Sequence, residues 1–273
     1  MLKIICLVSL ASLAIYAQDL WQGEAYAKHS TSQKLSAERF LERVTLHPTD
    51  RLLDVGCGDG KISARLASDL PMGSVVGVDL SPSMLTKASQ AFGEVANLSF
   101  SLQDAAHLGF QEEFDVITSF TVMHWVLEQD LALEGFKKAL RPKGRLYIQM
   151  PTALPHAMEK ALQVTVKDPQ WGFYLENFSP PWHFYTEDEY RQLLVAHGFS
   201  ITFTRVVTDH ETFPSREAFH GFLKQWFPYL RPLPEELKEP FLQKLLDNYV
   251  QEVSFGEEVP FVVDRLEVAA IKP

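Results

Sequence analysis

The sequence is poor in the residues that build disulfide frameworks and metal centres. Its 273 residues include two cysteines, Cys6 and Cys57, which offer no C-x-x-C spacing. The nine histidines form no H-x-x-x-H pair, so the sequence predicts no metal site. A chain of this length removes roughly three quarters of its unfolded surface from water when it folds. We therefore expect it to fold on its hydrophobic core alone, without a covalent or metal crosslink.

Positive charge is also scarce. The 25 Lys and Arg residues stand against 35 Asp and Glu residues, which gives a formal net charge of −10 at pH 7. A field of that sign repels a polyanion, so nucleic acid is excluded as a favoured partner. With 46% hydrophobic and 22% charged residues, the composition is that of an ordinary globular protein and not of a disordered or collagen-like chain.

The N-terminus has the pattern of a secretory signal peptide. Lys3 precedes an uncharged apolar run over residues 4–17, and the small residue Ala17 stands before a polar pair. The run is too short for a membrane-spanning helix, which needs ~20 residues. We expect residues 1–17 to be a leader ahead of one folded domain over residues 18–273, with an interfacial anchor or a wrongly assigned start codon as alternatives. A functional leader predicts export, and a non-functional one predicts a cytoplasmic protein.

After the leader, the hydrophobic pattern alternates between the periods of strands and helices. Short apolar runs predict strands over residues 51–55, 74–79, 98–102, 114–120 and 144–150. Amphipathic segments predict helices over residues 36–46, 61–70, 82–92 and 129–140. Strands that alternate with helices imply a parallel sheet with helices on both faces, joined by right-handed crossovers. The sequence therefore predicts an α/β, doubly wound, Rossmann-like fold.

The second half of the chain completes the sheet and adds insertions. Thr186 and Glu189 fit the capping box of a helix that Gly198 closes, with Tyr185 and Tyr190 as its hydrophobic staple. Further elements are predicted as strands over residues 199–207 and 261–271 and as helices over residues 214–230 and 234–253. The sheet is thus expected to be seven-stranded and mostly parallel. Insertion or lid elements are expected at about residues 151–185 and 210–255.

An aromatic cluster lies within the first of these insertions. Its members are Trp171, Phe173, Tyr174, Phe178, Trp182, Phe184 and Tyr185. Such a cluster either packs a core or forms a lid over a hydrophobic ligand, and the sequence leaves both interpretations open.

Residues that can bind a nucleoside are predicted at the carboxyl ends of the strands, where open α/β sheets bind their ligands. The turn after the first strand carries Gly56, Gly58 and Gly60, and glycine both admits a ligand to the backbone and permits a positive φ. Asp79 ends the second strand, and a carboxylate accepts both hydrogen bonds of a ribose diol. Asp104 ends the third strand, where its carboxylate and the N–H of Ala105 suit an adenine edge.

A nicotinamide dinucleotide fold is the nearest alternative, and the glycine turn argues against it. The G-x-G-x-x-G pattern requires glycine at position 61, where this chain has Lys61. Asp59 places a negative charge where a pyrophosphate binds. The carboxylate of Asp79 also repels a 2′-phosphate, so the sequence favours an unphosphorylated nucleoside.

Two motifs resemble those of class I S-adenosylmethionine-dependent methyltransferases. Residues 53–60, L-D-V-G-C-G-D-G, are similar to the first motif of that superfamily, and residues 77–81, G-V-D-L-S, are similar to its ribose motif. The resemblance covers about residues 21–150 and implies methyl transfer from S-adenosylmethionine. It implies a cofactor site made of Asp54, Gly56, Cys57, Gly58, Gly60, Asp79, Leu80, Asp104, Ala105, Ser119 and Phe120. Asp54 as a loop cap and Cys57 as a small residue in a tight turn are the structural alternatives.

A further set of residues resembles the subset that contains trans-aconitate methyltransferase and the insect juvenile hormone acid methyltransferases, which esterify carboxylates. The set comprises Trp21, Tyr26, Ser30, Ser32 and Gln33, with residues 118–120 and His124, Trp125 and Val126. The resemblance implies a small carboxylic acid as substrate, held by Gln33 and Trp125 with His124 beside them. A carboxylate is already ionised at neutral pH, so its methylation needs no general base.

Two other functions stay open at this point. A phenol, quinone, lipid or amine acceptor needs deprotonation, and His29, His124 or His183 is then the candidate base. The other is a non-catalytic exported module that binds the cofactor and acts through protein contacts. It stays open because the cofactor is made in the cytosol, so an exported enzyme needs another compartment that supplies it.

Overall fold

The structure is a computed structural model that describes residues 31–253 and 256–273. The predicted leader lies outside the described residues, as do Trp21, Tyr26, His29 and Ser30, and so does the side chain of Ser32. None of the helices in the described ranges is both long and apolar enough to cross a membrane.

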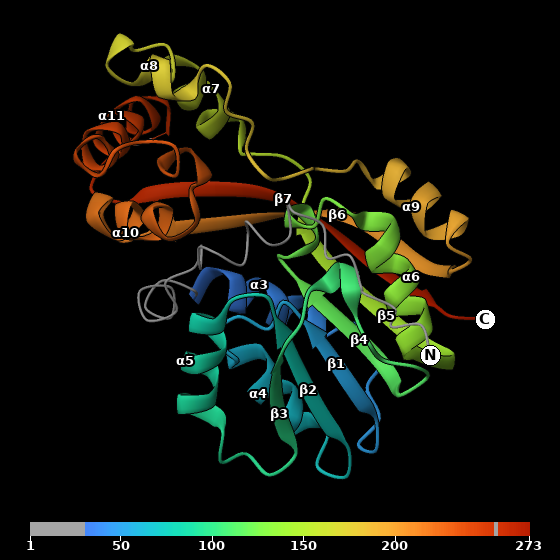
Figure 1. Cartoon of the computed structure of the whole chain (residues 1–273). Coiled ribbons are helices and arrows are strands. Elements are labelled where there is room, and N and C mark those ends of the chain that lie inside the picture. Colours follow the sequence, from blue (N-terminus) through green and yellow to red (C-terminus); the bar gives the residue numbers. More distant parts are fainter. Residues whose placement is uncertain (1–30, 254–255) are drawn as a thin grey trace, which may run out of the picture.

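One seven-stranded sheet forms the framework of the molecule, with the strand order β3-β2-β1-β4-β5-β7-β6 (Figure 1). Its strands are β1 (Arg51–Val55), β2 (Ser74–Asp79), β3 (Leu98–Leu102), β4 (Phe114–Phe120), β5 (Leu140–Pro151), β6 (Ser200–Phe213) and β7 (Val259–Ile271). The strands β1 to β5 are parallel, and β7 runs antiparallel to both of its neighbours. The predicted doubly wound, mostly parallel sheet is confirmed. Its strand order reverses between β1 and β4, which is where such sheets bind ligands.

Helices cover both faces of this sheet (Figure 1). They are α3 (Thr31–Leu41), α4 (Lys61–Asp69), α5 (Pro82–Phe92), α6 (Gln129–Ala139) and α9 (Glu187–Ala196), with the short 3-10 turns η1 (Ala105–His107) and η2 (Met123–Trp125). Leu52 and Leu53 are neighbours in β1 but belong to different cores, because successive side chains of a strand point to opposite faces. Leu52 shares its core with Phe40 of α3, and Leu53 shares its core with Phe136 of α6.

Local capping explains where two of these helices begin. The Ser81 hydroxyl accepts the backbone N–H of Met84, ahead of the proline that opens α5. The predicted capping box of α9 is confirmed, with the Thr186 side chain and the Glu189 side chain each bonded to the backbone of the other. The Tyr185 and Tyr190 rings lie 5.3 Å apart as the predicted staple.

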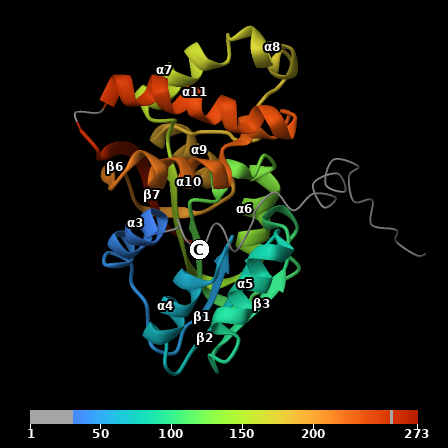
Figure 2. The ribbon, with the colours of Figure 1, turned by 90° about the vertical axis from the view of Figure 1, so that its left-hand side faces the viewer.

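A helical lobe extends from the sheet beyond the carboxyl end of β5 (Figures 1 and 2). It contains α7 (His156–Thr165), α8 (Pro169–Leu175), α10 (Arg216–Trp226), η3 (Pro228–Leu230) and α11 (Glu235–Val253). The lobe has a core of its own, in which Trp171 lies against Phe241 and its indole N–H donates to the Thr165 carbonyl at 2.6 Å. The outer ends of β6 and β7 pass through this core with Phe213 and Phe261. The lobe occupies most of the two predicted insertions, and its role as a lid stays a prediction.

Several element boundaries differ from the prediction, those of the first helix, β5 and β6 by four residues or more at one end. The first helix is Thr31–Leu41 instead of residues 36–46, because Val44 and Leu46 reach the core from irregular backbone just before a proline. The strand β5 begins at Leu140, which pairs with Phe114, whereas the prediction ended a helix at residue 140 and began the strand at residue 144. The strand β6 continues to Phe213 instead of ending at residue 207, so the second predicted insertion begins inside it. Residues 208–212 lay between the predicted strand and the next predicted helix, and they pair with the outer half of β7.

Candidate active site

The turn between β1 and α4 is built from glycines with left-handed backbone. Gly56 has a φ of 73° and Gly60 a φ of 79°, a region that L side chains rarely adopt. A Cβ atom on Gly56 would lie 2.2 Å from Cγ2 of Val122, and one on Gly60 would lie 2.9 Å from Cβ of Ala88. The backbone N–H groups of Gly56 and Cys57 both donate to the carbonyl of Val78 in β2. The turn is therefore fixed as bare backbone at the end of the sheet.

Asp54 lies beneath this turn and is buried. Its Oδ2 accepts the Ser63 hydroxyl of α4 at 2.6 Å, and its Oδ1 accepts the Thr118 hydroxyl of β4 at 3.0 Å. Burial raises the pKa of Asp54 to about 6, and the negative charge of Asp79 acts in the same direction while the two hydroxyls oppose it. Asp54 thus links three elements around the turn, as its structural alternative predicts, and it also lines the cavity described below.

Asp79 connects the ends of β1 and β2. Its Oδ2 accepts the N–H of Gly58 at 2.9 Å, and its Oδ1 accepts the N–H of Ser81 at 2.9 Å. A carboxylate accepts hydroxyl groups, which is the role predicted for Asp79 toward the ribose. Asp104 at the end of β3 holds η1 in a similar way, because its Oδ1 accepts the N–H of Ala106 at 2.9 Å.

A solvent-connected cavity of about 450 Å³ lies over the glycine turn. It is lined by Gln33, Lys34, Asp54, Gly56, Cys57, Gly58, Asp59, Lys61, Ile62 and Phe120. The negative charges of Asp54, Asp59 and Asp79 all act on the Cys57 thiol, whose pKa is raised first by burial and then by these charges. Lys34 and Lys61 also line the cavity, and Lys61 pairs with Asp59 at 2.8 Å. The carboxylates of Asp54 and Asp79 suit a ligand with positive charge. S-adenosylmethionine, with its sulfonium and ammonium groups, fits this set of residues.

The other predicted cofactor residues lie along the same edge of the sheet. Leu80 follows β2, Ala105 begins η1, and Phe120 ends β4. Of the predicted cofactor residues, Asp54, Gly56, Cys57, Gly58 and Phe120 line the cavity, whereas Gly60, Asp79, Leu80, Asp104, Ala105 and Ser119 do not. The buried Ser119 hydroxyl donates instead to the Val55 carbonyl at 3.1 Å. The assignments to the cofactor stay predictions.

A second cavity of about 600 Å³ lies between the sheet and the helical lobe, and we call it the acceptor cavity. It is lined by Gln33, Thr121, His124, Trp125, Pro151, Ala153, Leu154, Pro155, Trp182, Phe184, Phe222, Trp226, Phe261, Val263 and Arg265. The structure thus brings the three predicted substrate residues to one cavity. Gln33 also lines the cavity over the glycine turn, which we call the cofactor cavity after its predicted ligand. Gln33 therefore lies where the two cavities meet.

The aromatic cluster of the first insertion divides between two roles. Trp182 and Phe184 line the acceptor cavity, whereas Trp171 is buried in the lobe's own core. Phe173 and Tyr174 are exposed at the surface of α8. Both alternatives left open by the sequence therefore apply, each to a different part of the cluster.

His124 is a buried imidazole, 4% exposed, that stacks on Phe184 with 5.8 Å between ring centroids. Burial and the nearby Arg265 guanidinium lower the pKa of His124 to about 3. Its Nδ1 has no hydrogen-bond partner among the described residues. His124 is therefore neutral at physiological pH.

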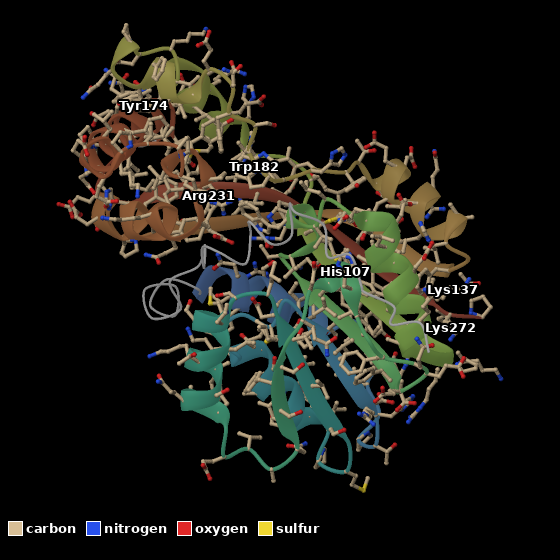
Figure 3. All side chains as sticks on the ribbon, viewed as in Figure 1. His107, Lys137, Tyr174, Trp182, Arg231 and Lys272 are labelled. Carbon is tan, nitrogen blue, oxygen red and sulfur yellow. The ribbon has the colours of Figure 1, made fainter. Side chains whose placement is uncertain are left out.

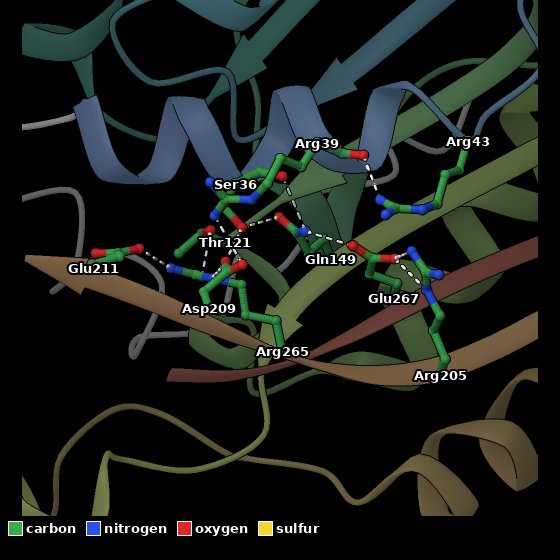
Figure 4. A network of polar contacts seen from close by, with 10 residues as sticks. All are labelled: Ser36, Arg39, Arg43, Thr121, Gln149, Arg205, Asp209, Glu211, Arg265 and Glu267. Atoms are coloured by element: carbon green, nitrogen blue, oxygen red, sulfur yellow. Dashed lines mark hydrogen bonds and ion pairs between the residues drawn. The ribbon is translucent and has the colours of Figure 1, made fainter. Parts of the chain in front are cut away.

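A network of polar side chains that the sequence analysis missed holds the acceptor cavity together (Figure 4). Asp209 of β6 accepts the Ser36 hydroxyl of α3 at 2.5 Å and forms ion pairs at 2.8 Å with both Arg39 and Arg265. Arg265 of β7 also donates to the Thr121 hydroxyl at 3.3 Å. This network fixes α3, and with it Gln33, against the β6–β7 pair.

One signal in the sequence was available for this network. Asp209 and Glu211 alternate along β6, and Arg265 interrupts an apolar run in β7. Charged residues that alternate within a strand point to one face, where they pair with an opposite charge. Glu211 and Arg265 do so at 3.3 Å.

The strand order, the glycine turn and the acidic strand ends define an adenosyl-binding α/β fold of the class I methyltransferase type. A family model described as a methyltransferase domain matches residues 46–196, which is more than half of the chain. The chain belongs to this family and is an S-adenosylmethionine-dependent methyltransferase.

Known proteins are similar over most of the chain. Trans-aconitate 2-methyltransferase of Methylobacterium nodulans is 26% identical over 231 residues, which are 82% of this chain and 86% of that relative. The YcgJ protein of Bacillus subtilis has a TM-score of 0.61 at 17% identity and covers 89% of this chain and 99% of its own. Phosphoethanolamine N-methyltransferase 2 of Haemonchus contortus has a TM-score of 0.59 at 16% identity, and the match covers 97% of this chain and 61% of that protein. The two structural likenesses show the fold alone.

Proposed function

We propose that the protein methylates a carboxylate oxygen of a small acid with a largely apolar body. The observation that carries the proposal is the chemistry of the acceptor cavity. Its described lining residues include no carboxylate and a single imidazole, that of His124. With a pKa of about 3, His124 is too weak a base to deprotonate a phenol, an alcohol or an ammonium group at neutral pH. An acceptor that arrives ionised removes the need for a base.

The positions of Gln33 and Trp125 support the same acceptor. Gln33 lies where the two cavities meet, and a neutral amide N–H orients a carboxylate without neutralising it. The bound cofactor supplies an electrophilic methyl group. An acceptor oxygen attacks the methyl carbon, and the carbon–sulfur bond breaks with its electron pair left on sulfur. Because charge is neutralised in this step, the protein contributes mainly by alignment and by excluding water.

The lining of the cavity and one relative add support. Trp182, Phe184 and Trp226 present apolar area to the body of the substrate. The relative from Methylobacterium nodulans is named for the methylation of an acid, trans-aconitate. The leader predicted from the sequence would place this reaction in a compartment that must supply the cofactor.

The proposal is tested by transfer of a labelled methyl group to a panel of aromatic, aliphatic and polycarboxylic acids, trans-aconitate included, beside matched phenols and amines. We expect an acid to be labelled and the product to release its label in mild alkali, as an ester does. Above the pKa of the acid, kcat/KM should not change with pH. A label that resists alkali, or a rate that rises tenfold per pH unit towards the pKa of a phenol, contradicts the proposal.

A second measurement separates cofactor binding from acceptor identity. Calorimetry with S-adenosylmethionine should show binding to the wild type, lost in Asp79→Ala, because Asp79 holds the glycine turn through Gly58. Gln33→Ala should keep cofactor binding within about threefold and lower transfer to the acid at least tenfold, since about 1.4 kcal/mol corresponds to tenfold. Loss of cofactor binding in both variants would contradict the division between the two cavities.

A further inference from the structure

The electrostatic balance of the acceptor cavity leaves an ionised acid without an obvious attraction. The chain carries a net charge of −10, which repels an anion at long range. Arg265 lines the cavity, but its guanidinium is 5% exposed and pairs with both Asp209 and Glu211. Its positive charge is therefore already compensated within the protein. A cationic group outside this network is needed to favour a carboxylate.

Arg231 is such a group. It follows η3 in the helical lobe, and its Cζ lies 5.9 Å from the centre of the Trp125 ring, which lines the acceptor cavity. Figure 3 places Arg231 and Trp182 near the junction between the lobe and the sheet. Arg231 is half-buried, and burial lowers the pKa of its guanidinium.

Arg231 differs from the other arginines in its partners. Each of the others in the described ranges donates to an oxygen of the protein, and the set is Arg39, Arg43, Arg51, Arg65, Arg141, Arg145, Arg191, Arg205, Arg216 and Arg265. The side chain of Arg231 has no ion pair or hydrogen bond within the described residues, and its recorded interaction is with the face of Trp125. A guanidinium drawn partly out of water without an acceptor is unfavourable for stability. Its partner is therefore expected to come from outside the residues that the structure describes.

We propose that Arg231 is the specificity-determining residue that selects the ionised acid over its neutral methyl ester. The inference rests on the proposed carboxylate acceptor and deepens it. A guanidinium donates two parallel N–H groups to a carboxylate, whereas an ester carries no charge to attract. Arg231 thus favours the substrate over the product from its position against Trp125, although it is not itself among the residues that line the acceptor cavity.

The chemistry of methyl transfer predicts which kinetic constant depends on Arg231. The negative charge of the acceptor disappears as its oxygen bonds to the methyl carbon. An interaction with that charge is therefore no stronger in the transition state than in the bound substrate, and it contributes to substrate binding. Loss of Arg231 should raise KM and leave kcat nearly unchanged.

The test compares Arg231→Met, Arg231→Lys and the matched control Arg216→Met, whose arginine lies in the same lobe and pairs with Asp247. The substrate is the carboxylic acid that gives the highest labelling in the panel above, and the inhibitor is its methyl ester. For Arg231→Met we expect KM to rise about tenfold or more, with kcat and the inhibition constant of the ester within about twofold. Arg231→Lys should restore most of the affinity for the acid. Arg216→Met should leave KM at the wild-type value.

Thermal unfolding supplies a readout that a structural role cannot reproduce. Because Arg231 has no described acceptor, Arg231→Met should unfold at the same temperature as the wild type or above it. A KM within twofold of wild type overturns the proposal, and so does an equal loss of affinity for acid and ester, which indicates pocket shape instead of charge. A wild type that labels phenols or amines and no acid contradicts the proposed function itself, and the role of Arg231 falls with it.

Discussion

The two cavities of this molecule are built in different ways. The cofactor cavity is centred on a glycine turn that hydrogen bonds to β2 and to Asp79, all within residues 56–79, while Gln33, Lys34 and Phe120 add to its lining from α3 and β4. The acceptor cavity is formed by side chains from α3, η2, β7 and the helical lobe, which are far apart in the sequence. The cofactor cavity therefore depends mainly on local backbone geometry, whereas the acceptor cavity depends on long-range packing and charge pairing.

The largest expected effect lies in the charge network of the acceptor cavity. Asp209→Ala leaves the buried Arg265 with Glu211 alone and removes the ion pair to Arg39. Removal of one partner from a buried ion pair destabilises a protein by about 3–5 kcal/mol. We expect a loss of this size in the free energy of unfolding, measured with urea, together with weaker transfer to the acid.

An exposed ion pair provides the control for this variant. Glu134 and Lys138 lie 3.9 Å apart on the surface of α6. Glu134→Ala should change the free energy of unfolding by about 1 kcal/mol or less, because surface pairs contribute little. Equal effects of Asp209→Ala and Glu134→Ala would show that the network does not hold the acceptor cavity together.

The second largest expected effect is the pH dependence of stability that Asp54, beneath the glycine turn, produces. The pKa of Asp54 is about 6 in the folded chain against an ordinary value of 3.8, so the folded state binds the proton more tightly. The contribution of Asp54 to stability is present in full below about pH 4 and is lost as pH rises through 6. A shift of about two pKa units corresponds to ~3 kcal/mol.

Asp54→Asn isolates this contribution, because the amide keeps the shape of the side chain and does not ionise. Between pH 4 and pH 7, the free energy of unfolding of Asp54→Asn should rise relative to wild type by about 3 kcal/mol. Urea unfolding of both proteins across this range measures the difference. Parallel curves for the two proteins would mean that Asp54 is ionised at an ordinary pKa.

The backbone of the glycine turn gives the third effect. In Gly56→Ala, the new Cβ meets Val122 and the left-handed conformation adds about 1–2 kcal/mol of strain. We expect cofactor affinity to fall roughly tenfold to a hundredfold in calorimetry, since each 1.4 kcal/mol is tenfold. Gly172→Ala is the matched control, because nothing lies within 4 Å of its added Cβ and its helix gains about 0.5–1 kcal/mol. A cofactor affinity in Gly56→Ala equal to that in Gly172→Ala would contradict the close fit of the turn.

The same contrast explains how much of the molecule could be predicted from sequence. The first four strands have the predicted bounds, because short apolar runs between turn residues determine them locally. The outer half of β6 was not predicted as a strand, because Asp209 is stable in a buried strand only when Arg265 of β7 pairs with it. Arg231 gave no sequence signal at all, since its importance depends on the acceptors that it lacks. Local rules therefore sufficed for the cofactor cavity and failed where distant side chains meet.

The smallest expected effect lies in the aromatic cluster, where two residues two positions apart should behave in opposite ways. Phe173 is 84% exposed, whereas Trp171 is 1% exposed and its indole N–H donates to Thr165. Phe173→Ser should change the free energy of unfolding by about 0.5 kcal/mol or less, because it removes no buried contact. Trp171→Phe loses a buried hydrogen bond and leaves a gap. It should lower the free energy of unfolding by about 1–3 kcal/mol. If Phe173→Ser keeps full stability but weakens transfer to the acid, Phe173 reaches the acceptor cavity when substrate binds, and the lobe acts as a lid.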